Sequence, residues 1–165
     1  MQEVTINKAA RLSEHFTLGE MCKTSAKTAD GNIPSHVHIE NLKRLCGWLE
    51  ELRRRSLTPN PSPKGEGSEY KEVPIIINSG YRSPQVNKAV GGAPNSNHLT
   101  GCAVDIHVAG IEQLVRYAAI LLDISDERQE DFDELLLERS PKGSYWLHFA
   151  VKPTGNRRKV KLIQT

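Results

Sequence analysis

The sequence predicts an α+β fold in which a small antiparallel or mixed sheet is flanked by helices. Two stretches repeat apolar residues at the three-and-four spacing of an amphipathic helix, and several short runs are rich in β-branched or aromatic residues. These helical and strand-like patterns alternate along a chain of 165 residues, a length that suits a single domain over residues 1–165. Together the patterns favour helices packed against a modest sheet.

The first helix is predicted over residues 39–52. Its apolar positions are Ile39, Leu42, Leu45, Cys46, Leu49 and Leu52, and Ser35 is a candidate N-cap. Residues 56–72 follow, with prolines at 59, 61 and 63 and glycines at 65 and 67. Such a composition buries too little apolar surface to offset the entropy lost on ordering. We therefore expect a flexible insertion at residues 56–72.

The rest of the chain alternates strands with helices. Residues 74–78 form a β-branched run, and Ser83-Pro84 then provides a cap and a first-turn proline for a short helix that ends at Gly91-Gly92. Residues 92–101 are typical of a loop, and a second long helix is predicted from Ile111 to Leu122. The remaining predicted strands are residues 102–108, 135–138, 146–151 and 160–163, with 135–138 and 146–151 joined through Pro141-Lys142-Gly143.

Charge and cysteine content exclude several classes of protein. A net charge of +2 is too small to indicate nucleic acid binding, and a basic cluster near the C-terminus is typical of a solvated edge strand: Arg157, Arg158, Lys159 and Lys161. The three cysteines form no C-x-x-C pair, so reduced thiols are expected. The first residues lack the apolar core of a signal peptide, and no apolar run is long enough to span a membrane. We expect synthesis in the cytoplasm and a monomer.

A charged residue within an apolar strand is the first chemical signal. Asp105 follows His98 by seven residues, and Val104 and Ile106 on either side of it would point to the opposite, core-facing side. A carboxylate placed this way is costly unless it is paired or bound to a metal. The alternatives left open by spacing alone are a satisfied polar group and a salt bridge.

A second polar residue interrupts another apolar strand. His148 lies within Trp146-Leu-His-Phe-Ala-Val151, where alternation favours one more packing side chain. Two histidines and one carboxylate would leave the fourth tetrahedral position of a zinc ion open for water, as catalytic zinc requires. Water bound in that position has a pKa of roughly 7 and is a nucleophile at neutral pH.

Several separated motifs resemble one family in the same order. They are Ile77-Asn-Ser-Gly-Tyr-Arg-Ser-Pro84, Asn87, Val90-Gly-Gly92, Ser96-Asn-His98 and Gly101-Cys-Ala-Val-Asp-Ile106, preceded by Phe16-Thr-Leu-Gly-Glu20 and Asn41-Leu42. This set resembles the zinc D-alanyl-D-alanine carboxypeptidases and phage L-alanyl-D-glutamate endopeptidases, in the carboxypeptidase-like subgroup of the hedgehog/D-Ala-D-Ala peptidase fold. The resemblance covers about residues 16–151 and implies Zn²⁺ bound by His98, Asp105 and His148.

The resemblance also implies substrate contacts. Arg82 corresponds to the family arginine that holds the substrate carbonyl or carboxylate, and its fixed charge suits a developing oxyanion. The alternative is an arginine that ties a loop together through backbone carbonyls. Ser96 matches a flanking position of the metal motif. Tyr81 either lines the same cleft or is a packing residue. Both are included as substrate-binding candidates.

The general base is where this chain departs from the family. Many relatives have an acid three positions before the last histidine ligand, but here that residue is Tyr145. The nearest upstream acid is Glu138, which would approach His148 if residues 135–138 and 146–151 pair as a hairpin. Glu138 is then a base, an orienting partner for a ligand imidazole, or a plain surface residue.

The remaining histidines have weaker signals. His107 shares the strand face of Asp105, and either a hydrogen bond to the ligand shell or a surface position fits it. His15, His36 and His38 have no matching partners.

By resemblance, the expected activity is a zinc metallopeptidase, either a carboxypeptidase or an endopeptidase, that acts on peptidoglycan stem peptides. It would act on the wall after phage-type release or on wall fragments during recycling. Two alternatives stay open: a non-catalytic zinc module that binds peptidoglycan, and a phage structural component.

Overall fold

The structure, a computed structural model, describes residues 5–56, 58–60, 69–71 and 73–165. Its helices are α1 (Leu18–Met21), α2 (His36–Arg55), α3 (Pro84–Ala89) and α4 (Ile111–Arg128), with a 3-10 turn η1 (Asn97–Thr100). Its strands are β1 (Thr58–Asn60), β2 (Glu69–Lys71), β3 (Ile77–Ser79), β4 (Ala103–His107), β5 (Glu134–Arg139), β6 (Tyr145–Ala150) and β7 (Lys159–Gln164). The predicted α+β class is confirmed.

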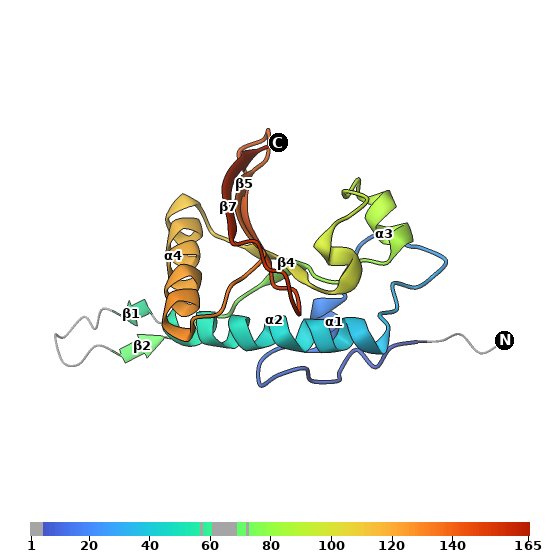
Figure 1. The fold of residues 1–165 in the computed structure, drawn as a ribbon, viewed down its shortest axis with the longest axis horizontal. Coiled ribbons are helices and arrows are strands. Elements are labelled where there is room, and N and C mark those ends of the chain that lie inside the picture. The colour runs from blue at the N-terminus through green and yellow to red at the C-terminus, as the bar shows by residue number, and fades with distance from the viewer. Residues whose placement is uncertain (1–4, 57, 61–68, 72) are drawn as a thin grey trace.

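The main sheet is mixed. Within the described residues its strand order is β3-β4-β6-β5-β7, and all neighbouring strands are antiparallel except β5 and β7. The predicted hairpin is present, because β5 and β6 pair from Glu134↔Ala150 to Arg139↔Tyr145. Figure 1 shows these strands between α4 on one side and α3 on the other, above the long helix α2.

One face of the sheet packs on α2 and α4 and forms the core. Ser35 caps α2 as predicted, through a hydrogen bond from the His38 backbone. The Trp48 ring of α2 lies 5.4 Å from the Phe149 ring of β6, measured between centroids. Four other core-facing residues of the central strands are fully buried, namely Val104, Ile106, Leu135 and Leu147, and Leu137 is partly buried. We call this side the core face.

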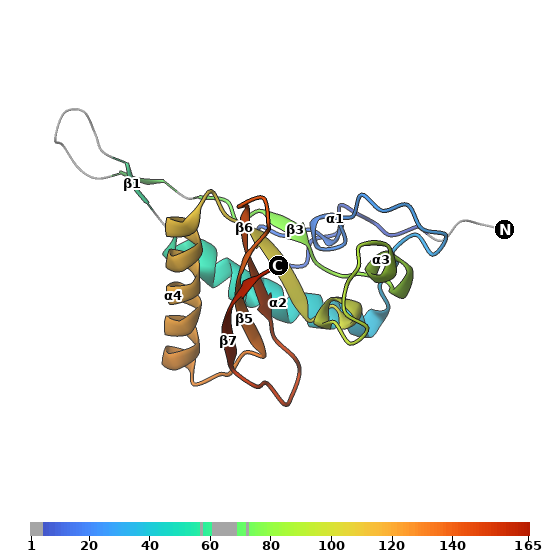
Figure 2. The same cartoon turned by 90° about the horizontal axis from the view of Figure 1, so that it is seen from above.

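The opposite side, which we call the site face, carries the polar residues of the same strands. Because side chains alternate along a strand and register partners share a face, this face includes Asp105, His107, Glu134, Leu136, Glu138, Trp146 and His148. Figure 2 shows that α4 lies on one side of the strands, whereas α3 lies beyond β3 on the other. The alternation predicted for Asp105, Val104 and Ile106 is therefore confirmed.

Some local predictions need refinement. The strand predicted over 74–78 forms ladder pairs only at Ile77–Ser79, where its register with β4 is irregular. The loop predicted over 92–101 contains η1. Of the predicted insertion at 56–72, β1 and β2 pair as an antiparallel ribbon that extends beyond the end of α2 in Figure 1. Residues 57, 61–68 and 72 lie outside the described residues, so the flexibility of the insertion stays a prediction.

The expected chemical state of the cysteines agrees with the structure. Cys22, Cys46 and Cys102 are free and buried, and burial raises the pKa of Cys22 and Cys46 to about 12. Their thiols are therefore protonated packing groups. Among the described residues, no helix is long and apolar enough to cross a membrane.

Candidate metal centre

Three candidate ligands from different elements meet on the site face. His98 comes from η1, Asp105 from β4 and His148 from β6, and one ligand atom of each lies within 4.8 Å of the other two. Asp105 Oδ1 lies 3.0 Å from His148 Nδ1 and 3.4 Å from His98 Nε2. The structure therefore brings together all three residues that the sequence predicted as ligands.

Strand pairing and a capped turn place these side chains. Asp105 and His148 are direct register partners across β4 and β6, so their side chains rise side by side. The Ser96 hydroxyl accepts a hydrogen bond from the His98 backbone at 3.2 Å and caps η1. Gly101 ends η1 with a φ of 72°, and a Cβ atom there would lie 2.6 Å from the His38 carbonyl. Only glycine fits this close approach.

A backbone carbonyl determines the tautomer of His98. Its Nδ1 lies 2.7 Å from the Gly80 carbonyl oxygen, which can only accept, so Nδ1 carries the proton and Nε2 presents a lone pair. The side chain is 3% exposed, so the ring has little freedom to turn. Gly80 is itself held closely, because a Cβ atom there would lie 2.2 Å from the Met21 carbonyl oxygen.

Glu134 supports His148 from the other side. His148 Nε2 is buried and makes no hydrogen bond of good geometry to the described residues. Its nearest charged neighbour is Glu134 Oε1, at 3.5 Å. A carboxylate near Nε2 favours the proton on that nitrogen and leaves Nδ1 free to bind a metal.

The donor set fits a zinc ion. In the neutral tautomer, the lone pair of His98 Nε2 faces a carboxylate oxygen of Asp105, and this arrangement is repulsive unless a cation lies between them. Burial alone would lower the pKa of His148, but the nearby carboxylates of Asp105 and Glu134 raise it to about 9. Burial raises the pKa of Asp105, but the two imidazoles lower it by more. The pKa of this carboxyl therefore lies well below its usual value. Two imidazoles and one carboxylate are a ligand set that catalytic zinc uses.

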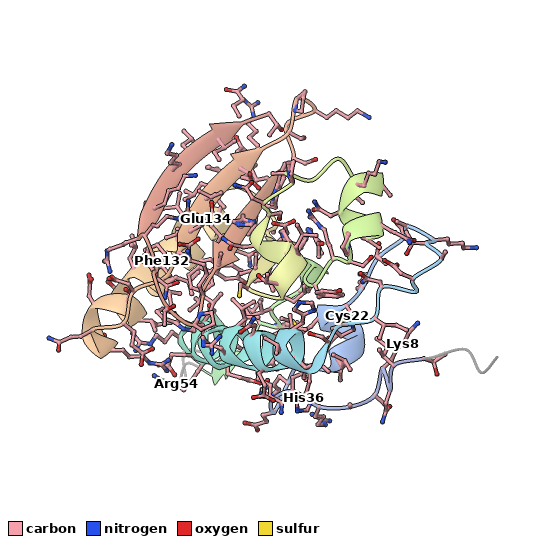
Figure 3. All side chains as sticks on the ribbon, turned by 45° about the vertical axis from the view of Figure 1, so that its right-hand side comes forward. Lys8, Cys22, His36, Arg54, Phe132 and Glu134 are labelled. Carbon is pink, nitrogen blue, oxygen red and sulfur yellow. The ribbon has the colours of Figure 1, made fainter. Side chains whose placement is uncertain are left out.

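Glu134 belongs to a wider polar network. Asn97 donates through Nδ2 to Glu134 Oε1 at 2.7 Å and to Asp133 Oδ2 at 2.8 Å. Lys159 Nζ lies 3.5 Å from Glu134 Oε2, and Arg157 forms two side-chain hydrogen bonds with the fully buried Asp133. Figure 3 shows Glu134 on the side of the sheet that faces η1. Chiefly through His148, this network lowers the pKa of Glu134 to about 2.

Glu134 was not predicted from the sequence, although a signal for it was present. Glu134, Leu136 and Glu138 alternate along β5, so both glutamates share one face. Leu136 is the direct partner of His148, and each glutamate is therefore a diagonal neighbour of that histidine. Glu138 was chosen as the nearest acid before His148, and alternation along the same strand would also have selected Glu134.

Arg82 reaches the centre from the turn after β3. One guanidinium NH2 donates to Asp105 Oδ2 at 2.9 Å, and Nε donates to Ser79 Oγ at 2.9 Å. Because Asp105 Oδ2 is occupied in this way, Oδ1 faces the two histidines. A guanidinium has five N–H donors, so Arg82 has others for a substrate oxygen. Neither of these side-chain bonds goes to a backbone carbonyl, which was the alternative for this residue.

Glu138 lies on the site face beside the cluster, as the predicted hairpin requires. It pairs directly with Trp146 and diagonally with His148. Burial raises its pKa above the ordinary value, although His148 and a hydrogen bond from the Trp146 side chain oppose the change. Its role as a base stays a prediction. Tyr145 begins β6 and pairs with Arg139.

The other candidates lie near the centre with different surroundings. Tyr81 is 3% exposed, and its ring stacks on His38 at a centroid distance of 4.9 Å, so its contact with a substrate stays a prediction. The same holds for Ser96, whose hydroxyl caps η1. His107 is exposed and shares a register position with Trp146. His15 lies elsewhere and contacts Glu50 at 2.7 Å.

An α+β fold with a buried His-Asp-His cluster, a nearby arginine and a neighbouring glutamate is typical of a metal-dependent hydrolase. Residues 66–128 match the sequence model of the family described as Peptidase M15. The resemblance to the zinc carboxypeptidase-like family is confirmed over this segment, which contains Arg82, His98 and Asp105 and ends before β5. No protein with a curated description matches the chain.

Proposed function

We propose that the protein is a zinc-dependent metallopeptidase that hydrolyses peptidoglycan-type peptides. The observation that carries the proposal is the convergence of His98, Asp105 and His148, two of which lie in the segment that matches Peptidase M15. The peptide class rests on the family resemblance. The substrate is a stem peptide cleaved either at a D-Ala-D-Ala end or at an internal bond, in the wall after phage-type release.

In the proposed reaction, His98, Asp105 and His148 would hold the zinc ion. Bound there, zinc supplies Lewis acidity and lowers the pKa of a coordinated water to roughly 7. Gly80 and Glu134 hold the two imidazoles in the required tautomers. These contacts would hold the metal-binding side chains in place before a substrate binds.

Two side chains complete the proposed chemistry. Arg82 donates its remaining N–H groups to the oxygen that gains charge as the amide is attacked. Glu138 accepts the proton from the attacking water and passes it to the leaving amine. A carboxyl whose pKa is raised by burial suits proton exchange better than a permanently ionised one.

A second candidate function is a zinc-containing module that binds peptidoglycan without cleaving it. The observation that favours it is Tyr145, which occupies the position where many relatives of the resembled family have the acid. In this case Glu138 would be a structural group, and the zinc site would serve stability or binding.

Hydrolysis of defined peptides separates the two functions. Purified protein is stripped of metal, reloaded with zinc and incubated with a stem peptide ending in D-Ala-D-Ala and with one containing an L-Ala-D-Glu bond. The peptidase proposal predicts that one of them is cleaved, only after reloading. Stoichiometric zinc without cleavage of either peptide, but with binding to peptidoglycan, would favour the module.

A further inference from the structure

We propose that Asn32 is a positioning residue that holds the turn around Arg82 so that its guanidinium faces the metal centre. Asn32 lies in the segment between α1 and α2, about fifty residues before the turn. The inference rests on the proposed function, because it gives Asn32 a part in the same reaction.

The Asn32 side chain bonds the backbone on both sides of Arg82. Its Oδ1 accepts a hydrogen bond from the Ser83 backbone at 2.7 Å, and its Nδ2 donates to the Tyr81 carbonyl at 3.2 Å. Nδ2 also donates to the Cys22 carbonyl at 2.9 Å. The peptide groups before and after Arg82 are therefore both held by one amide.

Asn32 is itself fixed in place. It is 3% exposed and has a left-handed backbone with a φ of 53°. Its backbone N–H donates to Asp30 Oδ1 at 3.2 Å, and the Thr28 hydroxyl donates to the same oxygen at 2.6 Å. Asparagine tolerates this backbone conformation better than most residues, so side chain and backbone are both suited to the position.

The backbone of Arg82 connects the turn to the metal centre. The Arg82 N–H donates to the His98 carbonyl at 3.0 Å, and the guanidinium bonds Asp105 and Ser79. The backbone around Arg82 is thus held by Asn32 and by a ligand residue at the same time. A shift of this backbone moves the guanidinium relative to both Asp105 and the substrate oxygen.

A side-chain amide suits this position because its partners are one donor, the Ser83 N–H, and two acceptors, the carbonyls of Tyr81 and Cys22. Aspartate has the same shape but places an acceptor against the Tyr81 and Cys22 carbonyls, which leaves them without donors. Glycine removes the amide and keeps the left-handed backbone without strain. Asn32→Gly therefore isolates the role of the amide, and Asn32→Asp tests the need for its N–H groups.

The test is a double-mutant cycle between Asn32→Gly and Arg82→Ala, measured on zinc-loaded protein. We expect Asn32→Gly to lower kcat by on the order of tenfold with little change in KM, as for other groups that orient catalytic residues. In the Arg82→Ala background the same substitution is expected to change kcat by less than twofold. Asn32→Asp is expected to behave like Asn32→Gly. Asn87→Ala is the matched control, since Asn87 is also buried and its amide donates to a backbone carbonyl, that of Ala93.

A second measurement is independent of hydrolysis. Because Arg82 bonds Asp105, the zinc dissociation constants of the four proteins, obtained by competition with a chelator, should show the same non-additivity. For the control Asn87→Ala, the fold-changes in kcat and in the zinc dissociation constant are expected to multiply with those of Arg82→Ala, as for independent sites. If the fold-changes of Asn32→Gly also multiplied with those of Arg82→Ala in both measurements, the positioning role would be overturned. Absence of hydrolysis in the wild type, with a non-additive zinc cycle, would overturn only the proposed function.

Discussion

The two glutamates on the site face of β5 have contrasting surroundings. Glu134, at the start of the strand, lies beside Asn97, Lys159 and the Nε2 atom of His148. Glu138, four residues later, is half-buried beside Trp146 and has no cation bound to its carboxylate in the described residues. Contact chiefly with His148 lowers the pKa of Glu134 to about 2, whereas burial raises the pKa of Glu138.

This difference separates two tasks that a carboxylate can perform near a metal. A group that stays ionised orients a ligand imidazole, and a group that is easily protonated exchanges a proton with the reacting atoms. Neighbouring carboxyls with pKa values displaced in opposite directions are a common sign of such a division. The proposed mechanism therefore gives orientation of His148 to Glu134 and proton transfer to Glu138.

The largest expected effect is loss of turnover in Glu138→Gln. Without the carboxylate, kcat should fall by about 10²–10⁴-fold, while zinc content stays that of the wild type because Glu138 is not a ligand. Peptide cleavage assays and metal analysis on the same samples measure both. Glu112→Gln, on the exposed side of α4, is the control. Wild-type kcat in Glu138→Gln would remove Glu138 from the reaction.

Glu134→Gln should instead weaken the metal centre. Loss of the carboxylate beside Nε2 of His148 is expected to raise the zinc dissociation constant by about 10–100-fold. Activity should return when zinc is in excess, which distinguishes this variant from Glu138→Gln. Chelator competition measures the affinity, and unchanged zinc binding would contradict the orienting role.

The smallest expected effect is a pair of opposite stability changes in metal-free protein. The folded-state pKa of Glu134 is lowered, so its contribution is present above the unfolded value of about 4.3 and is lost as pH falls below it. For Glu138 the folded-state pKa is raised, so folding is favoured as pH falls. At pH 7, Glu134→Gln should therefore lose about 1 kcal/mol of unfolding free energy, and Glu138→Gln should lose none or gain slightly.

Urea unfolding at pH 7 and pH 4, in the presence of a chelator, measures these changes. The gap between the two variants should narrow at the lower pH, where Glu134 in the unfolded wild type becomes protonated. If the difference in unfolding free energy between the two variants were the same at pH 7 and pH 4, the two glutamates would not differ in their electrostatic surroundings.

Much of the fold and of the ligand cluster follows from local patterns in the sequence. The apolar spacing of α2, its Ser35 cap and the Ser83-Pro84 start of α3 are set by neighbouring residues, and all appear in the structure. Asp105 and His148 interrupt apolar strands, so alternation alone places them on a polar face. Alternation therefore marked Asp105 and His148 as unusual, and the family resemblance made them and His98 the predicted ligands.

Contacts between distant segments could not be predicted from local patterns. Asn32 lies in a loop without periodicity, and its bonds to Tyr81 and Ser83 depend on how distant segments meet. The network of Asn97, Asp133 and Arg157 likewise joins three separate segments. The parallel pairing of β7 with β5 also could not be predicted, because strand order is decided by the whole sheet.

Zinc content is the most direct test of the central claim, that His98, Asp105 and His148 form one metal centre. Metal analysis after purification with zinc should give about one zinc per chain for the wild type. For His98→Ala, which leaves two ligands, it should give much less, together with lower thermal stability. Equal zinc content in the two proteins would contradict the account.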